Sequence, residues 1–198
     1  MKAGRWIAAG LGLAVMGAAA VYAQYRNTEE PEFALVRAEG DFELRDYPAL
    51  VVAEVTSRGD RQRASGASFR RLAAYIFAQD RPQGGESIAM TAPVIQQDTG
   101  AGAWRMRFVM PSKYTLETLP PAPADITLTE VPARRMAAVR FSGNGGAAEL
   151  AAREASLRRW MEGQGITAIS EAEYAFYDAP MVPGPLRRNE VLIPVTSE

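Results

Sequence analysis

The feature of this sequence that most restricts its fold is an internal repeat. Residues 46–59 align with residues 130–143 at an offset of 84, and each segment reads as a strand that ends at a glycine turn. A helical pattern follows each segment, so we expect a duplicated strand-helix-strand-strand unit. The residues that coincide are Pro48 with Pro132, Ala49 with Ala133, Ala53 with Ala137, Val55 with Val139, and Gly59 with Gly143.

Two helices are predicted between short strands. Phe69, Leu72, Ala73, Ile76 and Phe77 fall on one apolar stripe of about four helical turns, with Ser65 or Ser68 as the N-cap. The second helix is expected over residues 147–162, with Leu150, Leu157, Trp160 and Met161 facing inward and Gly163 ending it. Strands are expected at residues 50–55, 104–110, 126–131, 136–141 and 191–195, where apolar runs or period-two alternation occur.

These elements predict an α+β fold. The two halves, about residues 33–118 and 124–198, are expected to form a curled, largely antiparallel sheet, a distorted barrel, with both main helices on one face. Residues 96–103 look like a polar hairpin loop. Residues 178–185 contain three prolines and a glycine beside Met181 and Val182, which makes this segment a candidate lid, with surface packing as the alternative.

The absence of histidine and cysteine excludes much catalytic chemistry. The chain of 198 residues cannot form a disulfide, a thiolate nucleophile, a Ser-His-Asp triad or a histidine-containing zinc site. Carboxylate pairs such as Glu43 with Asp46, or Glu171 with Glu173, are expected on solvated strand ends or turns. We therefore predict a protein that is not an enzyme. With 22 basic and 23 acidic residues, no nucleic-acid partner is expected either.

The N-terminus predicts export or membrane attachment. Lys2 and Arg5 precede an uncharged stretch, residues 6–23, and the first acidic residue is Glu29. This charge order is typical of a signal peptide or an N-terminal membrane anchor, here residues 1–23, followed by a linker at residues 24–32. The expected location is extracytoplasmic (periplasmic), or membrane-anchored if the segment is not cleaved.

Four motifs and the first helix carry a resemblance to a known family. The motifs are SIAMTAPV (87–94), RFVMPSKYTLETLPPAP (107–123), RFSG (140–143) and YDAPMVPGPLRRNEV (177–191), and the helix reads FRRLAAYIF (69–77). From about residue 33 to residue 195 the chain resembles the SOUL family of haem-binding proteins. The resemblance implies that haem or a related tetrapyrrole binds in a shallow apolar groove beside the first helix, with basic residues near the propionates.

The predicted ligand contacts follow from that resemblance and from the chemistry of haem. An apolar ring requires apolar contacts, and propionates require arginine or lysine. We expect helix contacts from Phe69, Arg70, Arg71, Ala73 and Tyr75, and softer contacts from Met90 and Met181. Arg187 and Arg188 either bind propionates or form a surface ion-pair network with Glu190.

The chain departs from some members of the family because it has no histidine to ligate iron. We therefore expect hydrophobic capture of haem without histidine ligation, by a carrier, buffer or sensor. The alternative is an effector-binding domain for other flat or amphipathic small molecules.

Overall fold

The computed structural model describes residues 28–196, so the predicted signal or anchor at residues 1–23 lies outside the described residues. Among residues 28–196, no helix is long and apolar enough to cross a membrane. The elements are β1 (Ala34–Glu39), β2 (Phe42–Tyr47), β3 (Leu50–Arg58), α2 (Arg61–Ile76), β4 (Val94–Gly100), β5 (Ala103–Val109), β6 (Thr127–Val131), β7 (Arg134–Ser142), α3 (Ala147–Gly163), β8 (Glu173–Phe176), the short 3-10 helix η1 (Gly184–Leu186) and β9 (Arg188–Val195).

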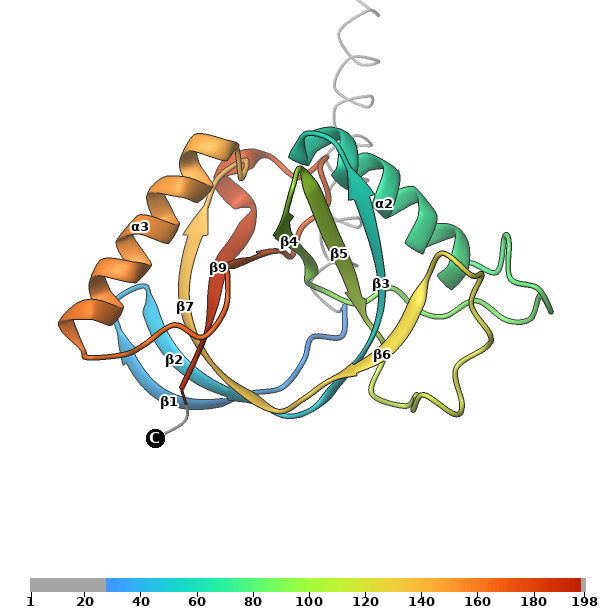
Figure 1. The fold of residues 1–198 in the computed structure, drawn as a ribbon, viewed down its shortest axis with the longest axis horizontal. Coiled ribbons are helices and arrows are strands. Elements are labelled where there is room, and N and C mark those ends of the chain that lie inside the picture. Colours follow the sequence, from blue (N-terminus) through green and yellow to red (C-terminus); the bar gives the residue numbers. More distant parts are fainter. Residues whose placement is uncertain (1–27, 197–198) are drawn as a thin grey trace, which may run out of the picture.

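Within the described residues, nine strands form one antiparallel sheet in the order β1-β2-β7-β9-β8-β4-β5-β3-β6. The sheet curls into a half-barrel (Figure 1), which confirms the predicted α+β architecture. The duplicated units are β3-α2-β4-β5 and β7-α3-β8-β9, and the bounds of β3 and β7 differ by the 84 residues of the sequence repeat.

The repeated prolines mark where the chain passes between the two halves. Strand β2 pairs with β7 of the second half, and after Pro48 and Ala49 the chain continues as β3 of the first half. Strand β6 likewise pairs with β3 before Pro132 and Ala133, and the chain then enters β7. Proline has no N–H to donate to a ladder, so it suits a point where the pairing partner changes.

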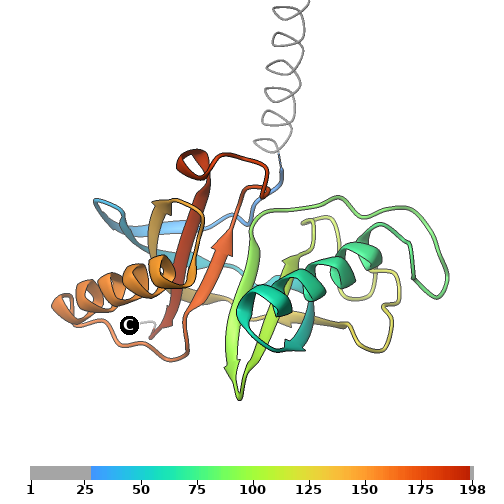
Figure 2. The ribbon, with the colours of Figure 1, turned by 90° about the horizontal axis from the view of Figure 1, so that it is seen from above.

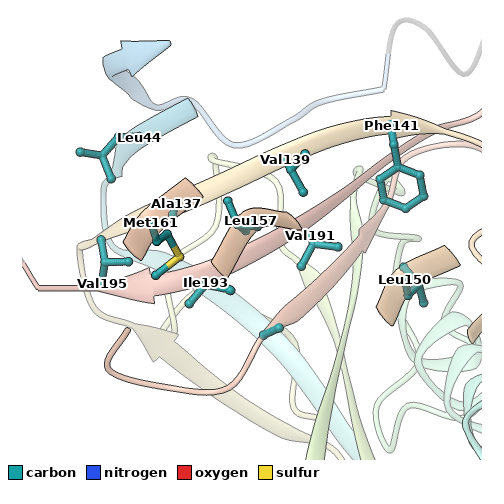
Figure 3. Packing of buried hydrophobic residues seen from close by; sticks show 11 residues of the cluster. Leu44, Ala137, Val139, Phe141, Leu150, Leu157, Met161, Val191, Ile193 and Val195 are labelled. Carbon is teal, nitrogen blue, oxygen red and sulfur yellow. The ribbon is translucent and has the colours of Figure 1, made fainter. Parts of the chain in front are cut away.

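Both helices lie on one face of the sheet, as predicted (Figure 2). Alternate residues of β7 and β9 pack against Leu150, Leu157 and Met161 of α3 (Figure 3). In the first half, Ala53 and Val55 of β3 pack against α2 in the same way. This alternation arises because successive strand residues point to opposite faces of the sheet.

Helix α2 starts earlier than the sequence indicated. Asp60, not Ser65 or Ser68, is the N-cap, because its carboxylate accepts a hydrogen bond from the Arg63 backbone N–H at 3.0 Å. Ser68 is instead buried inside the helix interface and donates to Ser57. Helix α3 begins at Ala147 as predicted and ends one residue later, at Gly163.

The predicted strands are all present, but the loop assigned to residues 96–103 is wrong. Strand β4 runs from Val94 to Gly100, and only residues 101–102 form the turn. Gln96 and Gln97 suggested a solvated loop, but both side chains are buried and hydrogen-bonded. Gln96 donates to Ser65 at 2.9 Å, and Gln97 donates to the Glu171 carbonyl at 3.4 Å. A polar strand can thus be internal when its amides are satisfied.

Candidate ligand-binding site

One flank of α2 carries large apolar side chains that the core does not cover. Phe69, Ala73 and Phe77 follow each other at intervals of four residues and form the α2 strip. Phe69 is 42% exposed and Phe77 is 47% exposed, whereas Leu72 and Ile76 are completely buried beneath the helix. The stripe predicted to face the core therefore divides, and its two phenylalanines face solvent.

The geometry of the α2 strip is that of a shallow apolar support. Eight residues of helix rise about 12 Å, so the two phenylalanines bound a surface of roughly that length. Ala73, which is partly buried, leaves the middle of the strip low. Phe69 rests on Phe108 of β5 in an edge-to-face contact with ring centroids 5.4 Å apart. The sheet thus holds one end of the strip in place.

The two arginines of the helix, Arg70 and Arg71, differ in availability. Arg70 is exposed and forms no ion pair within residues 28–196. Arg71 donates to Asp125 at 2.6 Å and also pairs with Asp80. Hydrogen bonding to Asp125 raises the pKa of Arg71, and the same bond lowers the pKa of Asp125. Of this pair, Arg70 is the one whose guanidinium faces solvent without a competing carboxylate.

Two other predicted contacts lie in or against the core. Tyr75 is fully buried, which corrects its expected position at the edge of the helix, and its hydroxyl donates to the Pro120 carbonyl at 2.7 Å. Burial raises the pKa of this phenol. Met90 is partly buried and packs against the cluster beneath α2. The structure thus brings Phe69, Arg70 and Ala73 to one surface and places Tyr75 and Met90 below it.

The remaining predicted contacts belong to the second half. Met181 is 70% exposed, whereas its neighbour Val182 is buried. Arg187 donates through Nε to the Val182 carbonyl at 2.6 Å and also bonds the Pro180 carbonyl, so it closes its own loop. Arg188 pairs with Glu30, and its guanidinium lies 3.8 Å from the centroid of the Tyr177 ring.

The proline-rich segment predicted as a lid packs within the second half. Gly184 lies so close to Asn144, in the connection between β7 and α3, that a Cβ on the glycine would approach the amide oxygen to 2.6 Å. The last two residues of this segment begin η1. The segment is thus seated at the start of α3 and does not cover the α2 strip.

Glu190 was expected in a surface ion-pair network, but it lies in a buried one on the sheet face away from the helices. Its side chain and that of Arg45 are each 1% exposed and meet through two hydrogen bonds of 2.8 and 2.9 Å. Tyr177 donates to the same carboxylate at 2.7 Å, and Arg140 at 3.2 Å. Burial alone would raise the pKa of Glu190, but Arg45 and the other donors hold that pKa below its usual range.

The other carboxylates considered for catalysis are paired with arginines. Glu173, expected at a solvated turn, is 1% exposed and receives two hydrogen bonds of 2.8 Å from Arg134. Asp46 accepts from Arg135 at 2.7 Å, and this bond lowers the pKa of Asp46. Within the described part of the chain, no group of three or more acidic, histidine or cysteine side chains could hold a metal ion.

A hollow of about 350 Å³ lies between the N-terminal segment and two of the motifs noted in the sequence. Its walls come from residues 29–32, from residues 48–51, from Thr91, and from residues 109–112 with Tyr114. No local sequence pattern predicts this hollow, because its walls come from segments that are separate in the sequence. Glu29 connects the N-terminal segment to both motifs. Its backbone carbonyl accepts a hydrogen bond from the Ala92 N–H at 2.9 Å, and its carboxylate accepts one from the Ser112 N–H at 2.6 Å.

Comparisons with known proteins agree with the motifs and the fold. A family model described as SOUL heme-binding protein matches residues 28–194. A search of curated proteins found no significant match. Among solved structures, the C-terminal domain of EcmrR is similar with a TM-score of 0.60 at 12% identity, covering 79% of this chain and 98% of that chain.

Two proteins from Listeria innocua are also similar. One is described as a hydrolase, with a TM-score of 0.55 and 15% identity over 81% of this chain and 94% of that one. The other is an uncharacterized conserved protein, with a TM-score of 0.57 and 14% identity over 79% of this chain and 92% of that one. At these identities the likeness concerns the fold alone.

Proposed function

Because the chain belongs to the SOUL haem-binding protein family, we propose that its folded domain binds haem or a related tetrapyrrole without catalysis, as a carrier, buffer or sensor. The observation that carries the proposal is the α2 strip, where Phe69 and Phe77 are 42% and 47% exposed on either side of Ala73. Large apolar side chains that are exposed together, beside a polar rim, are typical of ligand grooves.

The residues of the strip fit the chemistry of a tetrapyrrole. The two phenyl rings and the low centre at Ala73 offer apolar contact to one face of a flat macrocycle. Arg70 lies beside them and is free to bind a propionate through charge-assisted hydrogen bonds. Because the chain contains no histidine or cysteine, binding without an imidazole or thiolate ligand to iron is proposed, with apolar contact as its main source of affinity.

The size of this contribution can be worked out from the exposed fractions. A phenylalanine side chain carries roughly 200 Å² of surface, so each ring of the strip leaves about 90 Å² accessible. If a ligand covers half of that area, each ring contributes about 1 kcal/mol at roughly 25 cal/mol per Å². Loss of both rings therefore corresponds to a change in Kd of about thirtyfold.

The test is a titration of the full chain with ferric haem, followed by the Soret band and by tryptophan quenching. The variant Phe69→Ala/Phe77→Ala is expected to bind about thirtyfold more weakly than wild type. Ile169→Ala is the matched control, since Ile169 is an apolar residue 61% exposed in the connection between α3 and β8. Equal affinity of the double variant and the wild type, with both folded, would remove the α2 strip from the proposal.

The hollow of about 350 Å³ favours a second candidate function, the binding of another amphipathic small molecule. Pockets for such ligands usually measure about 300 to 1,000 Å³. Leu50 lines this hollow and a smaller cavity next to it, so Leu50→Trp is expected to fill the space. If Leu50→Trp lowers haem affinity while the strip variant does not, the ligand site moves to the hollow.

We also propose that the protein acts outside the cytoplasm or at the membrane, on the basis of residues 1–23.

A further inference from the structure

The proline-rich loop at residues 179–186 presents apolar side chains to solvent and carries no charged residue. Its sequence is APMVPGPL. Met181 is 70% exposed and Leu186 is 58% exposed, whereas Val182 between them is buried and fixes the loop to the domain. Large apolar side chains that are exposed together mark a surface for a ligand, a protein or a membrane. The backbone of the loop and its place in the fold decide between these partners.

Most backbone N–H groups of this loop do not need water as a partner. Three of its eight residues are prolines, which have no N–H. The Val182 N–H donates to the Ala179 carbonyl at 3.0 Å, and the Leu186 N–H donates to the Pro183 carbonyl at 2.9 Å. Three prolines and two bonded N–H groups thus account for five of the eight residues.

Most carbonyl groups of the loop are also satisfied from within the protein. The guanidinium of Arg187 donates to the carbonyls of Pro180 and Val182. The backbone N–H of Arg187 donates to the Gly184 carbonyl at 3.0 Å. Together with the two carbonyls that accept from N–H groups of the loop, five of the eight are hydrogen-bonded. Because unsatisfied backbone groups are what makes a loop costly to transfer out of water, this loop can enter an apolar phase at low cost.

The loop lies beside the start of the described chain. Arg188, two residues after Leu186, pairs with Glu30. Figure 2 shows η1 and the first described residues at the same side of the domain, the upper side of that view. The seven residues from position 24 to Glu30 span at most about 25 Å. A bilayer that holds residues 1–23 is therefore within reach of this side of the domain.

We propose that the 179–186 loop contacts the lipid bilayer and inserts Met181 and Leu186 at the boundary between headgroups and acyl chains. The identity of this partner rests on the proposed location at the membrane, whereas haem binding on the α2 strip does not depend on it. The contact orients the domain. Strand β9 begins at Arg188 next to the loop and runs to Val195, so its far end points away from the membrane surface.

The experiment relies on the absence of cysteine from the sequence, which allows one introduced cysteine to be labelled alone. Full-length Met181→Cys is labelled with nitrobenzoxadiazole and reconstituted into vesicles of phosphatidylcholine and phosphatidylglycerol. A nitroxide on the upper acyl chain should quench this label about threefold more than the same label on Ile169→Cys, since inserted apolar side chains reach that depth. Ile169 is the matched control because it is 61% exposed and lies at the far end of β9, where its N–H donates to the Pro194 carbonyl.

A second variant tests whether the apolar character of the loop causes the insertion. Leu186→Asp, added to the labelled Met181→Cys chain, should reduce quenching to the level of the Ile169 label, because a charge opposes entry into the bilayer. Its melting temperature should stay unchanged, since Leu186 is 58% exposed. Quenching that Leu186→Asp does not reduce would overturn insertion of the loop.

The other outcomes separate this proposal from the proposed function. If the chain floats with the vesicles but the Met181 label is quenched no more than the Ile169 label, the loop contact is overturned and the membrane location stands. A chain that does not float overturns both. A blue shift of the label that rises with protein concentration, without nitroxide quenching, assigns the loop to a second copy and overturns the lipid contact. Haem titration of the same samples is read separately, so loss of haem binding alone counts only against the α2 strip.

Discussion

Replacement of Glu190 by glutamine tests whether the buried network on the sheet face away from the helices stabilises the fold. The substitution keeps the shape of the side chain and removes its charge. Arg45 would then be 1% exposed with only Glu43, at 2.6 Å, as a charged partner. The Arg45 N–H groups and the Tyr177 hydroxyl now donate to the carboxylate oxygens. The glutamine amide would place its own N–H groups, which are also donors, against them.

The magnitude follows from the loss of one partner of a buried ion pair. Such a loss costs roughly 3 to 5 kcal/mol, because the remaining charge stays buried. Glu43 is 18% exposed and keeps its bond to Arg45, so we expect the lower end of that range, about 3 kcal/mol. For a domain of this length that corresponds to a fall in melting temperature of roughly 6 to 12 °C.

The assay is urea unfolding of wild type and Glu190→Gln at several pH values. Because the folded pKa of Glu190 is lowered, its stabilising contribution is complete above the unfolded pKa of 4.5 and is lost as pH falls through the folded value. The wild type should therefore lose its advantage over the variant in acid, and the two curves should converge. A difference of less than 1 kcal/mol at pH 7, or one that does not shrink in acid, would refute this reasoning.

Three further outcomes are expected. Ile76→Ala should lower the free energy of unfolding by about 2 to 5 kcal/mol in urea, because Ile76 is 1% exposed, and haem binding by the folded fraction should persist. Arg71→Ala should raise the pKa of Asp125 toward its usual value, as measured by NMR titration, because the hydrogen bond that lowers that pKa is lost. Cell fractionation should place the chain in membrane or extracytoplasmic fractions, and mass spectrometry should find either a mature start at Gln24 or retention of residues 1–23. Recovery from free cytosol would contradict the last expectation.

The architecture was predictable from the sequence where local pattern and burial agree. Strands β3 and β7 have apolar cores, and the repeat that relates them indicated the duplicated unit. Strand β4 was missed because its glutamines are buried by partners distant in sequence, such as Ser65, 31 residues earlier. Strand β2 was also missed, because its buried Arg45 is hydrogen-bonded to Glu190 at a separation of 145 residues. Hydrogen bonds between buried polar residues that are distant in sequence leave no periodic pattern in the sequence.

The candidate site was only partly accessible to the same reasoning. Phe69, Arg70 and Ala73 were identified because helical spacing and the family resemblance both concern the surface of α2. Tyr75 was misplaced because periodicity shows which residues share a face and not how far the core extends around the helix.

The internal repeat provides a comparison within the molecule for the α2 strip. In the helices the repeat is shifted by four residues to an offset of 88, so that Phe69 aligns with Leu157 of α3, which is completely buried, and Leu72 aligns with Trp160. The indole of Trp160 stacks on Phe42 of β2 at 5.5 Å and 7°, and its N–H donates to Glu39 of β1. The β1–β2 hairpin therefore covers this side of α3, and α3 carries no exposed large apolar residue.

On α2 the side that corresponds to Trp160 is also covered, because Arg71 pairs with Asp125 and Tyr75 donates to the Pro120 carbonyl. Phe69 and Phe77 lie on another flank, each more than two-fifths exposed. Two units with a similar strand and helix framework thus differ at this aligned position, because Phe69 is 42% exposed and Leu157 is buried. The packing of the core does not require that difference, because Leu72 and Ile76 already fill the interface beneath α2. An aligned apolar position that the core covers in one copy and that faces solvent in the other is available for contact with the ligand of the proposed function.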